Sequence, residues 1–516
     1  MTGARWNGRW GSHESLSLQG RGTARDSAQG EGVTEPHPLS PALRACPSPL
    51  EGEGPRTLFG KLWDSHVVAS VGGDDLVAID RVFLHERTGS VALRSLAAAG
   101  RRVLDPARVF AVTDHIVDTQ PGRTGTLVPG GNAFLSATRE ECRAAGIRLF
   151  DVDDPDQGIV HVISPELGIV LPGATLVCPD SHTCTQGALG ALAWGIGSTE
   201  AEHALATGTL RLPRPKTMRV TFDGALQPGV TPKDLMLSLI AAHGAGGGKG
   251  HAIEFAGAAV EALDIEGRLT LCNMATEFAA MSGFVAPDET TFAYLKGRRY
   301  APSGELWDQA VAAWRGLRTD PGAVFDREIR IDAAQVAPMI SWGTSPEDAV
   351  AVEGAVPDSK PRAHDYMAVV PGQPLIGTPI DAAFIGSCTN ARLSDLRRAA
   401  ALVRGRRVAA GVTAIVVPGS GAVRRAAEAE GLDLAFIDAG FEWRMSGCSL
   451  CFYAGGPGFA PGARVVSSTN RNFEGRQGPG VRTHIASPET VTASALAGAI
   501  ADPRQLVPLP PGERAK

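Results

Sequence analysis

The sequence contains little cysteine and no long apolar run. Its 516 residues include eight cysteines, whereas a secreted protein held together by disulfides would be far denser in them. No apolar run reaches the roughly 18–20 residues that a membrane-spanning helix needs, and the N-terminus shows no apolar core of a secretory signal. The net charge of −6 argues against a general polyanion binder. We therefore expect a soluble cytoplasmic protein that binds neither membranes nor nucleic acid.

Length and composition are those of a globular protein with several domains. Hydrophobic residues make up 43% of the chain and charged residues 20%, which is ordinary for a folded protein. The length allows roughly two to four domains. Residues 1–55 are rich in Gly, Ser, Arg and Pro and predict a disordered extension. We expect domains over 56–213, 214–335 and 336–505, followed by a tail over 506–516.

Short β-type runs alternate with Ala/Leu-rich helical runs after this extension. The alternation predicts an α/β fold with mostly parallel sheets, which carry their chemistry beyond the carboxyl ends of the strands. Residues 297–380 are rich in Pro, Gly and charge and predict a long irregular connection. The predicted strands cover residues 76–79, 109–112, 174–178, 382–385, 413–417 and 435–437, and the predicted helices include 91–99 and 393–403.

Three cysteines form a pattern typical of a metal site with an open position. Cys388 stands in Gly-Ser-Cys-Thr-Asn, and Cys448 and Cys451 stand in Gly-Cys-Ser-Leu-Cys. This set is one thiolate short of an ordinary iron–sulfur or structural zinc site, and a vacant position can take water or substrate. A lone buried cysteine is usually a small hydrophobe, and a lone C-x-x-C also fits zinc or redox chemistry. The combination favours an iron–sulfur cluster with one open iron. If a fourth cysteine ligand existed, the candidates would be Cys178, Cys184 and Cys272, which lie in different segments and form no paired motif with the other three.

Two Asp-His arrangements follow predicted strands. Asp114 precedes His115, and Asp180 and Ser181 precede His182. A histidine oriented by a carboxylate is a general acid or base near neutral pH. The alternative interpretation is a pair of polar turn residues. His161 is a weaker candidate, because it could equally be a core histidine.

Two further segments carry polar residues of interest. The run Asn470-Arg471-Asn472-Phe473-Glu474-Gly475-Arg476 predicts an anion clamp, because arginine binds carboxylates bidentately, although a solvated basic loop is the alternative. Glu277 lies four residues after Asn273 in an apolar helical run, where burial is costly unless a partner such as His182 is present. A partly exposed helix face would also explain Glu277.

Together these motifs resemble the aconitase superfamily, from about residue 57 to residue 498. The resemblance is carried by D-S-H-T-C-T at 180–185, I-G-S-C-T-N at 385–390, G-C-S-L-C at 447–451 and N-R-N-F-E-G-R-Q-G at 470–478. The D-S-H-T-C-T form, with Gly-Ile-Gly-Ser-Thr-Glu at 195–200, is most similar to the homoaconitase-like branch. The resemblance implies three domains of α/β/α layers around a central cluster, without the swivelling fourth domain of single-chain members.

The resemblance also implies roles for individual residues. Cys388, Cys448 and Cys451 would hold a [4Fe–4S] cluster whose open iron is a Lewis acid. His115, oriented by Asp114, would protonate a departing hydroxyl. Asp180 and His182 would hold and orient the iron-bound water, and Glu277 would support His182. The residues implied to contact substrate are His161, Ser181, Asn273, Asn470, Arg471 and Arg476.

The implied activity is the dehydration of a 2-alkylmalate and rehydration at the neighbouring carbon. The base that abstracts the proton belongs to the swivelling domain, so the resemblance implies a small-subunit partner of roughly 160–200 residues. Alternative substrates are homocitrate, citramalate and dimethylmalate. A cluster-sensing regulator that binds RNA in the apo form is a non-enzymatic alternative, disfavoured by the acidic balance.

Overall fold

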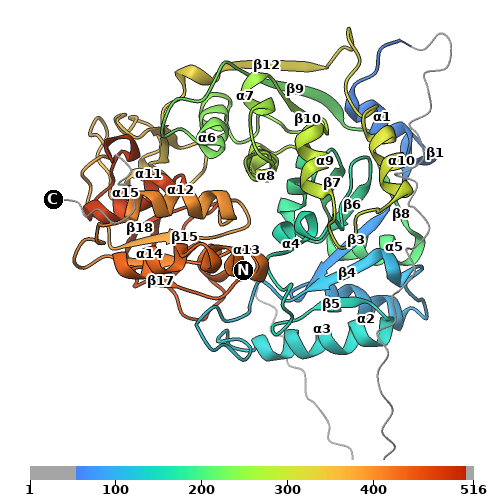
Figure 1. Ribbon diagram of the computed structural model, residues 1–516, viewed down its shortest axis with the longest axis horizontal. Helices are drawn as coiled ribbons and strands as arrows, with labels where there is room; N and C mark the ends of the chain where they lie inside the picture. Colours follow the sequence, from blue (N-terminus) through green and yellow to red (C-terminus); the bar gives the residue numbers. More distant parts are fainter. Residues whose placement is uncertain (1–53, 507–516) are drawn as a thin grey trace, which may run out of the picture. The chain divides into compact units, whose positions relative to one another are not determined.

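The computed structural model describes residues 54–506, which contain five β-sheets flanked by helices (Figure 1). The expectations for residues 1–53 and 507–516 lie outside the described residues. Helix α1, Leu58–Asp64, opens the described chain. No helix of the described part is long and apolar enough to cross a membrane. The predicted α/β class with parallel sheets is confirmed.

The first large sheet has the strand order β5-β4-β3-β6-β7 and is parallel throughout. Strands β4 and β6 are buried at every residue, as expected for apolar strands covered on both faces. Its strands are β3 Arg81–His85, β4 Val109–Val112, β5 Arg148–Phe150, β6 Thr175–Cys178 and β7 Leu192–Gly195. Its helices are α2 Gly89–Ala98, α3 Gly131–Ala145, α4 Val160–Glu166 and α5 Ser198–Thr207. A small antiparallel sheet joins β1 Val67–Val71, β2 Asp74–Ala78 and β8 Thr209–Leu212.

The second large sheet has the order β11-β10-β9-β12, again all parallel. Its strands are β9 Lys216–Asp223, β10 His251–Ala256, β11 Ser282–Phe284 and β12 Arg327–Asp332. The accompanying helices are α6 Pro232–His243, α7 Ala258–Glu261, α8 Ile265–Asn273, α9 Glu289–Leu295 and α10 Glu305–Trp314. Helix α8 runs directly into a 3₁₀ turn, Met274–Phe278. This helix and turn pack against the 3₁₀ segment Ser181–Leu189 of the first sheet's connections, so the two sheets share one apolar core.

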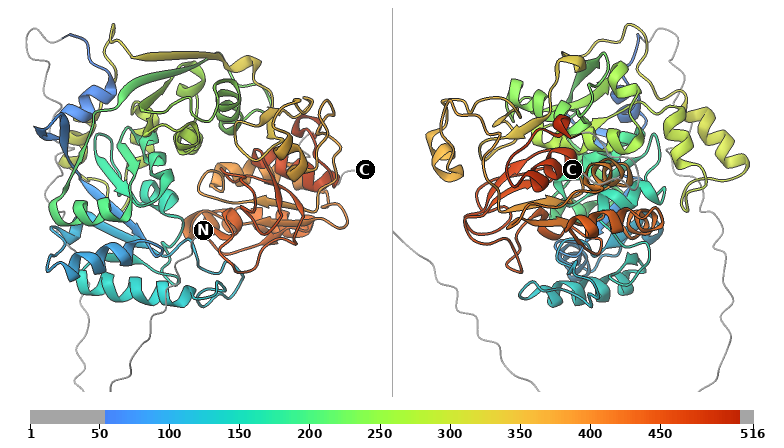
Figure 2. Two further views of the ribbon diagram at one scale, coloured as in Figure 1. Left: turned by 180° about the vertical axis from the view of Figure 1, so that it is seen from behind. Right: turned by 60° about the vertical axis from the view of Figure 1, so that its left-hand side comes forward.

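The third large sheet has the order β17-β16-β15-β18-β19 and is also parallel (Figure 2, orange). Helix α15 packs on the central strands β15 and β18. The strands are β15 Ala382–Ile385, β16 Thr413–Val416, β17 Glu442–Trp443, β18 Arg464–Ser467 and β19 Arg482–Ile485. The helices are α11 Pro361–Met367, α12 Leu393–Val403, α13 Gly421–Ala429, α14 Leu432–Ala439 and α15 Pro488–Ala497. An antiparallel pair, β13 Met339–Ser341 and β14 Ala349–Ala351, precedes this sheet.

Two local predictions are wrong. Residues 435–437, predicted as a strand, lie inside helix α14, where Leu432, Phe436 and Ala439 are buried at helical spacing; a three-residue apolar run does not by itself distinguish strand from helix. Residues 297–380 are not an irregular connection throughout, because they contain α10, α11 and β12 to β14. Strand β12 pairs with β9 although its exposed residues are charged, as an edge strand allows. The other predicted strands and helices are confirmed, with ends that agree or differ by one or two residues.

Candidate active site and metal centre

The catalytic candidates lie at the carboxyl edge of the first sheet. His85 ends β3, Asp114 and His115 follow β4, and Asp180 follows β6. The strand order places β3 between β4 and β6, so three consecutive strand ends present these side chains together. His115 is bracketed by carboxylates: its Nδ1 lies 2.6 Å from Asp114 Oδ1 and its Nε2 lies 3.1 Å from Asp180 Oδ2.

This bracketing fixes the protonation of His115. A carboxylate only accepts hydrogen bonds, so both ring nitrogens carry a proton and the ring is an imidazolium. Burial alone would lower the pKa of His115, but Asp114 and then Asp180 raise that pKa well above its ordinary value of 6.5. The charged ring in turn lowers the pKa of Asp114, against the effect of that group's burial.

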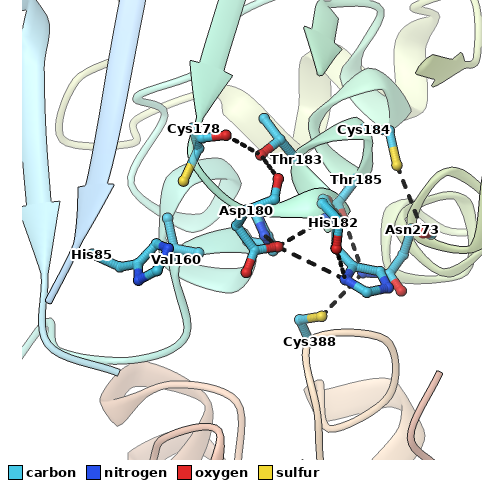
Figure 3. A network of polar contacts seen from close by, with 12 residues as sticks. His85, Val160, Cys178, Asp180, His182, Thr183, Cys184, Thr185, Asn273 and Cys388 are labelled. Carbon is cyan, nitrogen blue, oxygen red and sulfur yellow. Dashed lines mark hydrogen bonds and ion pairs between the residues drawn. The ribbon is translucent and has the colours of Figure 1, made fainter. Parts of the chain in front are cut away.

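Asp180 connects three histidines, His115, His161 and His182, and Figure 3 shows its contacts with His182. Its Oδ1 accepts hydrogen bonds from His161 Nε2 and from the backbone N–H of His182, both at 2.8 Å, while Oδ2 faces His115. Burial would raise the pKa of Asp180, but His161, His115 and His182 together hold it well below 3.8. Asp180 is therefore an anion that fixes the positions of the other groups.

His182 is held from its other side by Glu277. The His182 Nε2 lies 2.8 Å from Glu277 Oε1, and Arg471 Nε lies 2.7 Å from the same oxygen. Burial would raise the pKa of Glu277, whereas His182 and Arg471 lower it. The partner proposed from the sequence for this buried acid is thus in contact with it. Ser181 Oγ lies 3.3 Å from His182 Nδ1.

The three cysteines of the two motifs come together in one buried cluster. Ser387 Oγ lies 3.2 Å from Cys451 Sγ and 4.0 Å from Cys388 Sγ. Burial raises the pKa of Cys448, and Asp114, Cys451 and Cys388 raise it further. Ser387 and Ser449 hold φ angles of 81° and 47°, a left-handed conformation that strains a residue with a side chain and is found at functional turns.

The surroundings of these cysteines fit an iron–sulfur group. Asn273 Nδ2 and Asn470 Nδ2 donate to Cys388 Sγ at 3.2 and 3.4 Å, and Arg476 Nη2 lies 3.6 Å from Cys451 Sγ. N–H donors to cysteine sulfur tune such clusters. Within residues 54–506 the buried Asn470 Oδ1 and Arg476 Nε have no hydrogen-bond partner, so both remain available to a ligand.

The candidate fourth ligands lie in other apolar clusters. Cys178 packs with the buried aromatic residues of the first sheet, and Cys184 and Cys272 belong to the core shared by the first two sheets. Cys184 Sγ lies 3.6 Å from the carbonyl oxygen of Asn273 (Figure 3), and burial raises the pKa of Cys184 to about 12. Within residues 54–506 the structure thus brings together three cysteines and no fourth one.

Sequence reasoning missed several residues of this site. The His85 ring stacks on the His115 ring with centroids 4.3 Å apart, and burial lowers the pKa of His85 to about 4, which keeps it neutral. Glu86 accepts the backbone N–H groups of residues 114 to 116 at 2.6–3.1 Å. Phe452 lies 5.7 Å from the His115 ring. His85 is the last residue of β3 and Glu86 follows it, so the strand-end criterion that identified Asp114 and His115 could also have identified them.

Comparisons with known proteins agree with this geometry. Residues 60–498 match the aconitase family (aconitate hydratase). The chain therefore belongs to the aconitase family and is an enzyme of the hydro-lyase class. It is 56% identical over 463 residues to 3-isopropylmalate dehydratase large subunit 1 of Bradyrhizobium diazoefficiens, which covers 87% of this chain and 97% of that protein. A solved structure of proline utilization A from Corynebacterium freiburgense is 11% identical. The match covers 83% of this chain and 50% of that chain with a TM-score of 0.12, which does not indicate a shared fold.

Proposed function

We propose that this chain is the large subunit of a 3-isopropylmalate dehydratase, which isomerises 2-isopropylmalate to 3-isopropylmalate in leucine biosynthesis. The observation that carries the proposal is the 56% identity that extends over 97% of the Bradyrhizobium dehydratase subunit. Related hydro-lyases acting on homocitrate, citramalate or dimethylmalate are the enzymatic alternatives. A regulator that binds RNA without its cluster is the non-enzymatic one.

The proposed cofactor is a [4Fe–4S] cluster held by Cys388, Cys448 and Cys451. The three buried thiols and the N–H donors on Cys388 and Cys451 support it. When bound, the cluster would supply a Lewis acid at its open iron for the hydroxyl and carboxylate oxygens of the substrate.

His115 is proposed as the general acid. It holds protons on both ring nitrogens, and the contact to Asp180 at 3.1 Å is longer than the 2.6 Å contact to Asp114. The Nε2 proton is therefore the one we expect to transfer to a departing hydroxyl oxygen, leaving neutral His115 still anchored by Asp114. Stacking against the neutral His85 ring keeps the His115 plane fixed while the proton moves.

The second acid–base group is the pair formed by His182 and Glu277. Glu277 accepts the Nε2 proton of His182, so Nδ1 is the nitrogen that can hold or accept a proton on the side of Ser181. Asp180 fixes the backbone of His182 and the ring of His161. These groups are proposed to orient the water that leaves one substrate carbon and returns to the next.

Arginine and amide side chains are proposed to position the substrate carboxylates. Arg476 has one buried nitrogen without a partner, and Asn470 has its amide oxygen free within residues 54–506. Arg471 shares Glu277 with His182, which links the substrate clamp to the acid–base pair. Asn273 donates hydrogen bonds to Thr185 and to the Cys388 sulfur and accepts one from Thr389. It would therefore position substrate indirectly, by holding the loop that carries Cys388.

The base that removes the substrate proton is proposed to come from a small-subunit partner that contributes the swivelling domain. The described residues would then form the three layered domains around the cluster. The Bradyrhizobium relative is itself named a large subunit, which supports this division of the site.

The test is the activity of the anaerobically reconstituted chain with a dehydratase small subunit. We expect the complex to dehydrate and rehydrate 2-isopropylmalate, which is monitored by the ultraviolet absorbance of the alkene intermediate. Neither subunit should be active alone. A chain that loads its cluster, assembles with the small subunit and turns over only homocitrate or citramalate would refute the assignment. Tight RNA binding by the apo chain without any turnover of the loaded complex would favour the regulator.

A further inference from the structure

Lys233 is a fully buried lysine that the proposed reaction does not use. It stands in the first turn of α6 and has 0% of its surface exposed. Its Nζ donates three hydrogen bonds: to Asn390 Oδ1 at 3.1 Å, to the carbonyl oxygen of Ser468 at 2.7 Å and to that of Thr469 at 2.8 Å. Burying an ammonium group costs several kcal/mol unless it is compensated, so this lysine requires an explanation.

The three acceptors belong to the two loops that carry the metal centre. Asn390 lies two residues after Cys388, on the loop that follows β15. Ser468 and Thr469 immediately precede Asn470, whose amide donates to the Cys388 sulfur. Lys233 therefore joins a helix of the second sheet's region to the Cys388 loop and the Asn470 loop at one point.

No carboxylate compensates this charge directly. Within residues 54–506 none forms an ion pair with Lys233, and the first turn of a helix is itself an unfavourable place for a cation. Asp395 and Asp234 are the acids that most raise the pKa of Lys233, but their oxygens accept hydrogen bonds from other groups. Asp395 accepts from Asn390, Arg398 and the backbone of Arg392, and Asp234 accepts from Thr231 and the backbone of Met339.

The remaining negative charge near Lys233 would come from the cysteines. Burial lowers the pKa of Lys233 to about 7, and the groups that oppose this shift are Asp395, Asp234, Cys388 and Cys451, in that order. Two of these four are proposed cluster ligands, which are thiolates only when metal is bound. Lys233 donates to Asn390, two residues from Cys388, and to Thr469, next to Asn470, so its ammonium group lies between the two loops that would hold the cluster.

We propose that Lys233 is a positioning residue of the metal centre, whose ammonium group offsets the buried negative charge of the cluster-bearing thiolates and joins the Cys388 and Asn470 loops. This inference rests on the proposed cluster. It goes beyond the reaction, because Lys233 contacts neither the cysteines nor the expected substrate groups and acts through the loops and through its charge.

The test compares charge-removing and charge-keeping variants during cluster loading. Lys233→Gln keeps hydrogen-bond donors without the charge, and Lys233→Arg keeps the charge. Lys61→Gln is the matched control, because Lys61 is also a buried lysine, 8% exposed, but pairs with Asp320 at 2.6 Å in another part of the molecule. The chains are reconstituted anaerobically, and iron and sulfide per chain, resistance to a chelator and the cluster's reduction potential are measured.

We expect Lys233→Gln to bind iron about 10- to 100-fold more weakly than the unmodified chain in competition with the chelator. This is the range found when outer-shell partners of metal ligands are lost. Its reduction potential should shift to more negative values, because reduction adds negative charge that the Lys233 ammonium group no longer offsets. Lys233→Arg should stay closer to the unmodified chain, and Lys61→Gln should match it.

Each outcome bears on one proposal. If the unmodified chain holds no iron, the cluster itself is refuted. If it holds the cluster and Lys233→Gln matches Lys61→Gln in iron retention and potential, the role of Lys233 is refuted. If Lys233→Gln does not fold, Lys233→Met keeps the side-chain length without the charge; failure of both apo chains to fold, by circular dichroism, would assign Lys233 to the fold and overturn the proposal.

Discussion

Replacing Asp180 with asparagine should damage the acid–base site more than any other single isosteric change. The carboxylate accepts three hydrogen bonds, from the side chains of His115 and His161 and from the backbone of His182. An asparagine keeps one oxygen and presents an N–H₂ group where the other stood, so at least one donor would face another donor. All three bonds involve a charged acceptor, and a bond of this kind contributes about 1.5–3 kcal/mol.

The magnitude follows from this count. If the loss of one charged hydrogen bond is felt fully in the transition state, kcat falls between about tenfold and 150-fold, because each 1.4 kcal/mol is a factor of ten. The pH profile should move as well. Asp180 helps raise the pKa of His115, and the general acid must be protonated. The activity of Asp180→Asn should therefore fall at a lower pH, on the alkaline side, than that of the unmodified complex.

The assay is steady-state turnover of 2-isopropylmalate by the reconstituted two-subunit complex between pH 6 and 10, with iron content matched between samples. Asp156→Asn is the control, since Asp156 pairs with exposed arginines near the surface. A variant whose kcat and alkaline limb both coincide with those of the unmodified complex would refute the role assigned to Asp180.

Three further results are expected. The pKa of Asp180 is lower in the folded chain than its ordinary value of 3.8, so the ionised Asp180 stabilises the fold above about pH 4 and this contribution is lost as pH falls further. The difference in unfolding free energy between the apo chain and Asp180→Asn should therefore shrink on acidification below about pH 4. A difference that stays constant would contradict this. Glu277→Gln should lower kcat by up to about 10²-fold with little change in KM, whereas a pure KM effect would reassign Glu277 to substrate binding. Cys448→Ser should lose the absorbance near about 400 nm typical of iron–sulfur clusters together with activity, while Cys142→Ser, a buried cysteine on α3, should retain both.

The sequence predicted which candidate residues lie together better than it predicted the middle of the fold. Asp114, His115 and Asp180 could be identified because they follow short buried strands, and parallel strands bring their carboxyl ends to one edge. Cys388, Cys448 and Cys451 could be identified because few chemistries use that ligand pattern. The strand expected over 435–437 was wrong because three apolar residues carry no period. The helical spacing of buried residues that defines α14 depends on Leu432 and Ala439, which lie outside that run.

The pair of His182 and Glu277 was predicted from the sequence, but other long-range contacts could not be. The stack of His85 on His115 depends on the order in which strands pair, and β3 enters between β4 and β6 only in the folded sheet. Lys233 lies 157 residues from Asn390 and 235 from Ser468, in a helix whose N-terminal Thr-Pro-Lys-Asp gives no indication of a metal centre. Its role is visible only once the loops are placed around its side chain.

The most direct test of the account is product analysis with the cluster-loaded chain and its small subunit. Given 2-isopropylmalate under anaerobic conditions, the complex should form 3-isopropylmalate through the alkene acid, faster than it converts homocitrate, citramalate or dimethylmalate. A loaded and assembled complex that leaves 2-isopropylmalate unchanged would contradict the account.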